Sequence, residues 1–217
     1  MLAAEAQTYH LAQLYLSFQP APELVYLCGD RAMTAAMGAD DPAAISAATW
    51  YLNHVFRDAG QAAESRVALA LDTARLLDPG RSDTERASYG LLHLACALSF
   101  ARLGREGDAW RHWDIANQAA KAMPEGYVHP WLRFGRSMVD AYTVTMLADL
   151  AKPHEAIQAA DRIDFDGMES QTRRSFHLIE TARAISAERS SRNTSTMLTA
   201  LHGWSPTRTY RGPPPRW

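Results

Sequence analysis

The chain has 217 residues, 47% of them hydrophobic, and a formal net charge of −2. This length fits one domain or one continuous helical array, and the near-neutral charge gives no strong sign that the whole molecule binds nucleic acid. Two cysteines do not suggest a disulfide framework, and no segment resembles a signal peptide or approaches the ~20 apolar residues that span a bilayer, so we expect a cytoplasmic protein.

Apolar residues recur with a period of about 3.6 residues along almost the whole chain, which predicts an all-α protein. Alternating strand patterns are not evident. We expect ten helices in five hairpins. Their approximate ranges are residues 3–18, 23–37, 42–59, 61–77, 83–103, 106–123, 131–150, 153–163, 171–188 and 193–202.

Capping residues support several of these boundaries. Asp41 is a candidate N-cap, with Pro42 as the first helical residue. Ser82 is a second candidate cap, and Glu85, three residues later, would complete a capping box. Ser170 is a candidate cap for the helix that follows it.

One sequence pattern is repeated along the chain: a helix, a short polar turn and a second, Ala-rich helix. It is clearest around Gly104 and Gly60, and weaker versions surround Gln19, Ala151 and Glu188. The turns lie 37 to 47 residues apart, more than the ~34 of a minimal tetratricopeptide (TPR) unit. Because a lone hairpin cannot bury its apolar face, copies stack into a solenoid with a concave binding surface. Residues 1–202 are therefore predicted to form a TPR-like, right-handed α-solenoid.

The last fifteen residues, 203–217, break this pattern. They contain four of the prolines, and no acidic residue follows Glu188 in the chain. This composition predicts an irregular, disordered tail. The alternative is a nucleic-acid contact, in which the tail arginines would bind phosphates and its aromatic residues would stack on bases.

Four segments resemble the C-terminal part of actinobacterial XRE-type transcriptional regulators. They are TWYLNHVFRDAG (49–60), ALSFARLGREGDAWRHWDIA (97–116), HPWLRFGRSMVDAY (129–142) and TRRSFHLIETARA (172–184). Such regulators have a helix-turn-helix DNA-binding domain followed by a TPR-like sensor domain. The resemblance implies a regulatory domain that senses a peptide, a small molecule or a partner protein. It also implies a homodimer, or a heterodimer with a full-length regulator.

The resemblance begins inside the sensor region, so the helix-turn-helix domain is missing from this chain. We therefore expect no direct DNA binding by it. The alternative function is a general TPR-like scaffold or adaptor unconnected with transcription.

In a TPR-like array the first helix of each hairpin lines the concave face. Alignment of the turns places these residues near it: Tyr9, Gln13, Trp50, Asn53, His54, Arg57, Arg102, Tyr142 and Asp149. The segments shared with the regulators add His129, Trp131, Arg136, Asp140, Arg173, Arg174, His177 and Glu180. Arginine would bind a carboxylate bidentately, and tryptophan would supply an apolar wall.

A packing role is the alternative for many of these residues. The tryptophans would then fill gaps between helices. Asn53 and Arg57 would bond the carbonyl groups at the helix end near Gly60, or pair with a neighbouring helix.

No enzyme motif is present: the sequence lacks GxSxG, a Walker A loop, GxGxxG and HExxH. We therefore expect a binding protein that is not an enzyme and has no cofactor. His93 and Cys96, at i and i+3, could form half of a metal site, but no matching pair is visible. A buried cysteine and a hydrogen-bonded histidine are expected there instead, and no metal.

Overall fold

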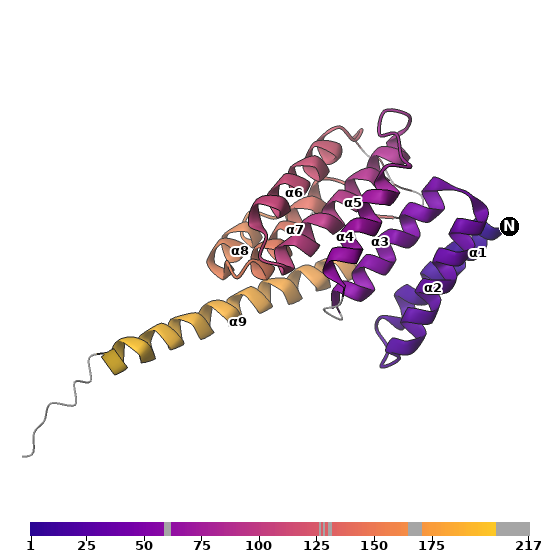
Figure 1. Cartoon of the computed structure of the whole chain (residues 1–217). Helices are drawn as coiled ribbons and strands as arrows, with labels where there is room; N and C mark the ends of the chain where they lie inside the picture. The colour runs from indigo at the N-terminus through magenta and orange to yellow at the C-terminus, as the bar shows by residue number, and fades with distance from the viewer. Residues whose placement is uncertain (59–61, 126, 128, 130–131, 165–170, 203–217) are drawn as a thin grey trace, which may run out of the picture.

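The computed structural model describes residues 1–58, 62–125, 127, 129, 132–164 and 171–202, with the backbone alone at 58, 172–173 and 194–202. In this part of the chain there are nine helices and no strand, so the all-α prediction is confirmed. In chain order the helices are α1 (Leu2–Leu16), α2 (Pro22–Ala39), α3 (Pro42–Asp58), α4 (Ala63–Ala74), α5 (Asp83–Arg102), α6 (Glu106–Lys121), α7 (Arg136–Asp149), α8 (Pro153–Ala160) and α9 (Gln171–His202) (Figure 1).

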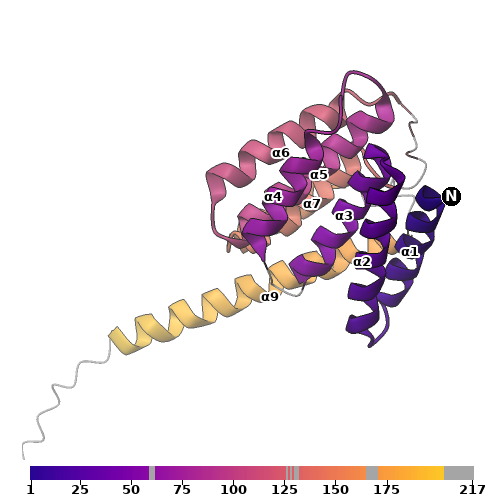
Figure 2. The ribbon, with the colours of Figure 1, turned by 45° about the vertical axis from the view of Figure 1, so that its right-hand side comes forward.

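Consecutive helices pack side by side along the chain. The odd-numbered helices also contact one another in order, α1 with α3, α3 with α5, α5 with α7 and α7 with α9. Helices α1 and α2 lie at one end of this arrangement (Figures 1 and 2), and α8 lies at the other (Figure 1). The first half of α9 packs against α7 and α8, and its second half extends away from the body (Figure 1).

The core centres on α5. Every residue from Gly90 to Ala101 is buried, which is expected of a helix that is apolar on all sides and surrounded by other helices. Gly90 allows an especially close approach, because a Cβ atom there would lie 2.2 Å from Cζ of Phe134. The ring of Phe134 thus occupies the space that any larger residue at position 90 would need.

The N-termini of α3 and α5 lie at the capping residues that the sequence predicts. Asp41 accepts a hydrogen bond from the backbone N–H of Ala43 at 3.0 Å, and Ser82 accepts one from Glu85 at 3.1 Å, so both caps are confirmed. The capping box is only half formed. The Glu85 carboxylate accepts from the backbone N–H of Asp78 at 2.8 Å, which ties the helix to the preceding turn.

The turns after α5 and α7 have the same geometry. Gly104 and Ala151 both have positive φ angles, +69° and +57°. Two backbone bonds close each turn. In the first turn the N–H of Arg105 donates to the carbonyl of Phe100, and that of Gly104 donates to the carbonyl of Ala101. In the second turn the N–H of Lys152 donates to the carbonyl of Leu147, and that of Ala151 donates to the carbonyl of Ala148. This is the Schellman arrangement of a helix C-terminus. The alignment of these two turns in the sequence is therefore confirmed.

The two helices predicted at 171–188 and 193–202 are wrong. Helix α9 runs without a break from Gln171 to His202, because this stretch contains no glycine or proline to end it. The helix predicted from residue 131 begins only at Arg136, since Gly135 adopts an extended conformation of positive φ. Gly60, Ser170 and the tail at 203–217 lie outside the described residues. None of the described helices combines the length and apolar character needed to cross a bilayer.

Candidate binding face

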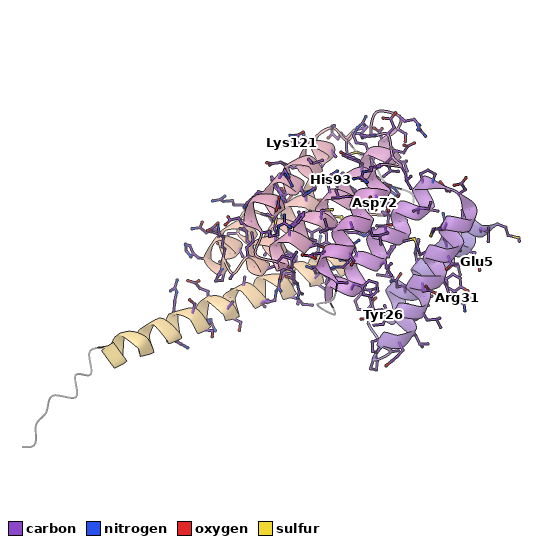
Figure 3. The ribbon with its side chains drawn as sticks, in the orientation of Figure 1. Glu5, Tyr26, Arg31, Asp72, His93 and Lys121 are labelled. Atoms are coloured by element: carbon purple, nitrogen blue, oxygen red, sulfur yellow. The ribbon has the colours of Figure 1, made fainter. Side chains whose placement is uncertain are left out.

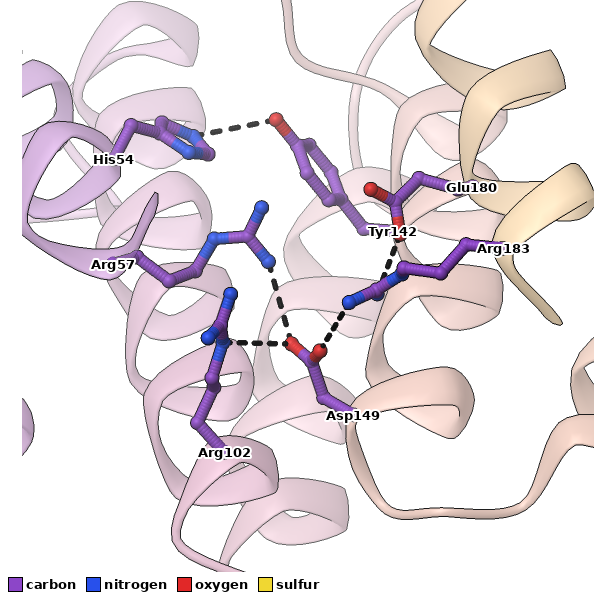
Figure 4. A network of polar contacts seen from close by, with 7 residues as sticks. All are labelled: His54, Arg57, Arg102, Tyr142, Asp149, Glu180 and Arg183. Carbon is purple, nitrogen blue, oxygen red and sulfur yellow. Dashed lines mark hydrogen bonds and ion pairs between the residues drawn. The ribbon is translucent and has the colours of Figure 1, made fainter. Parts of the chain in front are cut away.

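Helices α3, α5, α7 and α9 bring a set of polar and aromatic side chains together (Figure 4). Helix α3 contributes Trp50, His54 and Arg57, whose i, i+4, i+7 spacing places them on one side of the helix. Helix α7 contributes Tyr142 and Asp149, which are seven residues apart and also share a side. We call this set, together with Arg102 of α5 and Glu180 and Arg183 of α9, the binding face.

Aromatic rings form one half of the binding face. The Tyr142 hydroxyl lies 3.2 Å from Nε2 of His54, and the two rings stack with centroids 5.8 Å apart. Trp50 meets the edges of both rings, with centroids 4.2 Å from His54 and 6.0 Å from Tyr142. Trp50 and Tyr142 are both buried. The indole therefore fills space between α3 and α7, as the packing alternative expects, while His54 remains half-buried.

A buried carboxylate forms the other half. The Asp149 side chain is only 3% exposed and faces three guanidinium groups, at 3.4 Å from Arg57, 3.6 Å from Arg102 and 2.9 Å from Arg183. Arg183 also pairs with Glu180 at 2.6 Å. A carboxylate buried without cations would be strongly unfavourable, so these arginines offset the cost of burying the Asp149 side chain.

Three helices supply cations to this cluster. The guanidinium groups of Arg57, Arg102 and Arg183 face the carboxylate of Asp149, and Arg183 also faces that of Glu180. Burial would lower the pKa of Arg183, but Asp149 and then Glu180 outweigh burial and raise that pKa. The side chains of Arg102 and Arg183 are 34% and 41% exposed, so these two guanidinium groups can be reached from solvent.

A small hollow of about 10 Å³, the size of one water molecule, lies beside Arg57. Asn53 lines it, and the Asn53 amide donates to the carbonyls of Thr49 at 3.3 Å and Arg66 at 3.4 Å. Its Oδ1 atom is buried and has no hydrogen-bond partner among the described residues. Asn53 therefore pairs with neighbouring helix α4 through its N–H groups and keeps an acceptor beside the hollow. The hollow is lined by Asn53, His54, Arg57, Ala95, Leu98 and Ser99.

His129 does not join the binding face. It is buried in the segment before α7, where its Nδ1 accepts from the backbone N–H of Leu132 at 3.0 Å and its Nε2 lies 3.5 Å from Ser88 Oγ. Burial lowers the pKa of His129 to about 4, which keeps the ring neutral. Ser88 and Arg102 lie near opposite ends of α5, about 20 Å apart along a helix that rises 1.5 Å per residue.

Arg136 is also remote, because it begins α7 whereas Asp149 ends it. Its guanidinium donates to the carbonyl of Lys121 at 3.4 Å. It borders an open cavity of about 420 Å³ that is lined by Ala120, Met123, Pro124, Glu125, Tyr127, Phe134, Gly135 and Arg136.

Of the other predicted residues, Tyr9 and Gln13 lie on α1 and Asp140 lies in the first half of α7, apart from the binding face, while the rest lie at the start of α9 or outside the described residues. His177 is buried on α9, one turn before Glu180. Trp131 and the side chain of Arg173 lie outside the described part of the structure. Sequence reasoning missed Arg183. The signal was present, since His177, Glu180 and Arg183 continue one i, i+3 series along the same helix.

His93 faces a second histidine, not Cys96. Its Nδ1 lies 2.8 Å from Nδ1 of His112, and the ring of Phe100 also stacks with that of His112. Burial, with a smaller effect of His112, lowers the pKa of His93 to about 4. Burial raises the pKa of the Cys96 thiol to about 12. Within the described residues no group of three or more potential metal ligands occurs.

No protein-family model, no curated protein and no solved structure matches this chain.

Proposed function

We propose that this chain is a TPR-like α-solenoid that binds a ligand on the face formed by α3, α5, α7 and α9. The ligand is a peptide, a small molecule or a partner protein, and no reaction is catalysed. The chain serves as the sensor half of an XRE-type regulator.

The single observation that carries the binding role is the convergence of α3, α5, α7 and α9 on Asp149. Arg57 and Arg102 reach one carboxylate from two different helices, with His54 and Tyr142 beside them (Figure 4). The partly exposed guanidinium groups of Arg102 and Arg183 favour a ligand that carries a carboxylate. The half-buried ring of His54 beside them offers a contact to the rest of that ligand.

The solenoid part of the proposal is supported by the order of helix contacts. Each odd-numbered helix contacts the next odd-numbered one, and every even-numbered helix from α2 to α8 contacts the odd-numbered helices before and after it. Stacked hairpins make this pattern. The equivalent turns at Gly104 and Ala151 repeat one connection at two places in the array.

The sensing role follows from the position of Asp149 between elements. A ligand carboxylate that binds Arg57 or Arg102 competes with Asp149 for the same guanidinium groups. It therefore favours arrangements in which α7 and α9 are held differently against α3 and α5. Such a ligand shifts the population of states only by the difference between its affinities for them.

Selection from a random peptide library with free C-termini tests the binding role. We expect the wild-type protein to enrich peptides that an Arg57→Ala, Arg102→Ala double variant does not enrich. The matched control is Arg75→Ala, because Arg75 is an exposed arginine directly after α4 that pairs only locally with Asp72. Equal enrichment by all three proteins, or none by the wild type, would contradict the proposal.

The regulatory role has a separate test in the coding DNA. A helix-turn-helix region encoded in frame upstream of Met1 would support it. A coding region with its own promoter and no regulator beside it would favour the general scaffold or adaptor.

A further inference from the structure

An open cavity lies where α6 ends and α7 begins, and we call it the corner cavity. Its volume of about 420 Å³ lies within the ~300–1,000 Å³ that small-molecule sites span. Lys121, the last residue of α6, marks this corner at the upper end of that helix in Figure 3. Arg136 borders the cavity and begins α7, whereas Asp149 ends it. The corner cavity is therefore roughly 20 Å from the binding face, along a helix that rises ~1.5 Å per residue.

The wall of the corner cavity is largely apolar. Ala120 of α6 and Phe134, which precedes α7, are both buried. Met123 and Tyr127 are half-buried and complete this wall from the segment between the two helices. Aromatic and aliphatic groups of this kind bind the apolar part of a small ligand.

Two of the wall residues are fixed on α5. The Tyr127 hydroxyl donates to Oγ1 of Thr84 at 3.2 Å, near the start of that helix. The ring of Phe134 lies so close to Gly90 that a Cβ atom there would be 2.2 Å from Cζ of the ring. The two rings are thus held at separate points of the core helix. A wall fixed in this way costs a ligand little conformational entropy on binding.

Two opposite charges also line the corner cavity, the carboxylate of Glu125 and the guanidinium group of Arg136. Both side chains are exposed, and they do not pair with each other. Arg136 donates to the carbonyl of Lys121 at 3.4 Å, and a guanidinium group has five N–H donors, so it keeps those that a bidentate bond to a carboxylate requires. Among the described residues, Glu125 has no hydrogen bond or ion pair.

The charges around the opening are mixed in sign. Asp140 lies one turn after Arg136 on α7, and burial raises its pKa while Lys121 and then Arg136 act to lower it. In the described part of the chain Asp140 forms no ion pair with either cation. A ligand with one charge would be attracted by part of this rim and repelled by the rest. A ligand that carries both an acidic and an amino group matches it better.

We propose that the corner cavity binds a free amino acid with a large apolar side chain. The guanidinium group of Arg136 binds the α-carboxylate, and the carboxylate of Glu125 binds the α-ammonium group. The apolar side chain of the ligand lies against Phe134 and Tyr127. This is a second site, and it does not depend on the ligand of the binding face.

Isothermal titration calorimetry with phenylalanine and two of its derivatives tests this site. N-acetylphenylalanine lacks the ammonium group, and phenylalaninamide lacks the carboxylate. We expect the wild type to bind phenylalanine and to bind each derivative at least ~10-fold more weakly. Arg136→Gln should bind phenylalaninamide as tightly as phenylalanine, and Glu125→Gln should bind N-acetylphenylalanine as tightly as phenylalanine. Each variant removes the charge that distinguishes the two compounds.

The matched control is Arg111→Gln, because Arg111 is an exposed arginine of α6 that pairs with Asp108 away from the cavity. This variant and Arg57→Gln of the binding face should bind phenylalanine as the wild type does. Thermal melts that match the wild type show that the variants are folded. A wild type that binds neither phenylalanine, leucine nor methionine would overturn the proposal. So would equal binding of phenylalanine and its two derivatives, or a loss of phenylalanine binding in either control.

Discussion

Arg183 of α9 donates a hydrogen bond to Oδ1 of Asp149 at 2.9 Å, which joins the last helix to the C-terminal end of α7. The same carboxylate accepts from Arg57 of α3 through its other oxygen, and Arg102 of α5 lies within ion-pair distance of that oxygen. The buried side chain of Asp149 thus links α7 to three helices that are distant in the sequence, α3, α5 and α9. Its removal should affect the packing of all four helices.

We expect Asp149→Asn to destabilise the protein by about 2–3 kcal/mol, because it leaves three guanidinium groups facing one another without the central charge. Loss of a fully buried pair costs roughly 3–5 kcal/mol, and the partial exposure of Arg102 and Arg183 reduces this figure. Urea unfolding gives the free-energy change. Asp72→Asn is the control, since Asp72 forms an exposed pair with Arg75 and should change stability by less than ~0.5 kcal/mol. An equal loss of unfolding free energy in the two variants would show that Asp149 does not hold these helices together.

Gly90→Ala should destabilise the fold by about 1–2 kcal/mol, although alanine is the better helix former. The new Cβ would meet Phe134 at 2.2 Å, so the ring has to move. The double variant Gly90→Ala, Phe134→Leu should recover part of the loss. Gly107→Ala in α6 is the matched case with no atom within 4 Å of the new Cβ, and it should be neutral or stabilising. Thermal melts of the four proteins compare these effects.

The turns at Gly104 and Ala151 should respond to substitution with opposite signs. Ala151→Gly relieves a left-handed conformation that costs a non-glycine residue roughly 1 kcal/mol, so the melting temperature should rise. Gly104→Ala imposes the same cost and should lower the melting temperature. Shifts of the same sign in both variants would mean that the two turns are not equivalent.

Stability should fall as the pH is lowered from about 6.5 towards 4. Burial lowers the pKa of His10, His93 and His129 to about 4, and it also lowers that of His112. An unfolded histidine titrates near ~6.5, so over this window the unfolded chain binds more protons and acid favours it. The stabilisation is fully present above pH ~6.5 and is lost as the pH falls towards the native pKa values.

Urea unfolding between pH 7 and pH 5 measures this slope while most carboxylates remain ionised. Replacing His93 by Gln should flatten the slope, because it removes one of the histidines whose protonation the fold resists. A slope that is the same in the wild type and the variant would contradict the assignment.

The sequence predicts the helices and their connections well where local signals decide them. Asp41 and Ser82 cap helices because their side chains reach N–H groups two or three residues away. The likeness of the sequence around Ala151 to that around Gly104 predicts a turn there, even though alanine is a poor residue for a positive φ. These features depend on contacts within a few residues, which periodicity and capping rules describe.

The binding face was only partly predictable, since it depends on how distant helices cross. Alignment of the turns placed Arg57, Arg102, Tyr142 and Asp149 on one side of their helices. It does not reveal that the Asp149 carboxylate pairs with three arginines, because the third pair requires α9 to pass beside the end of α7. The i, i+3 series that ends at Arg183 was visible in the sequence. The separate helix predicted from residue 193 is wrong, because no glycine or proline breaks α9 between Gln171 and His202.

The affinity of a peptide recovered by selection for the wild type and for an Arg57→Gln variant tests the central claim most directly. Isothermal titration calorimetry should show binding to the wild type that weakens at least ~10-fold in Arg57→Gln, a loss of about 1.4 kcal/mol. The exposed control Arg75→Gln should bind as the wild type does. Equal affinity of all three proteins would contradict a ligand site on the face formed by α3, α5, α7 and α9.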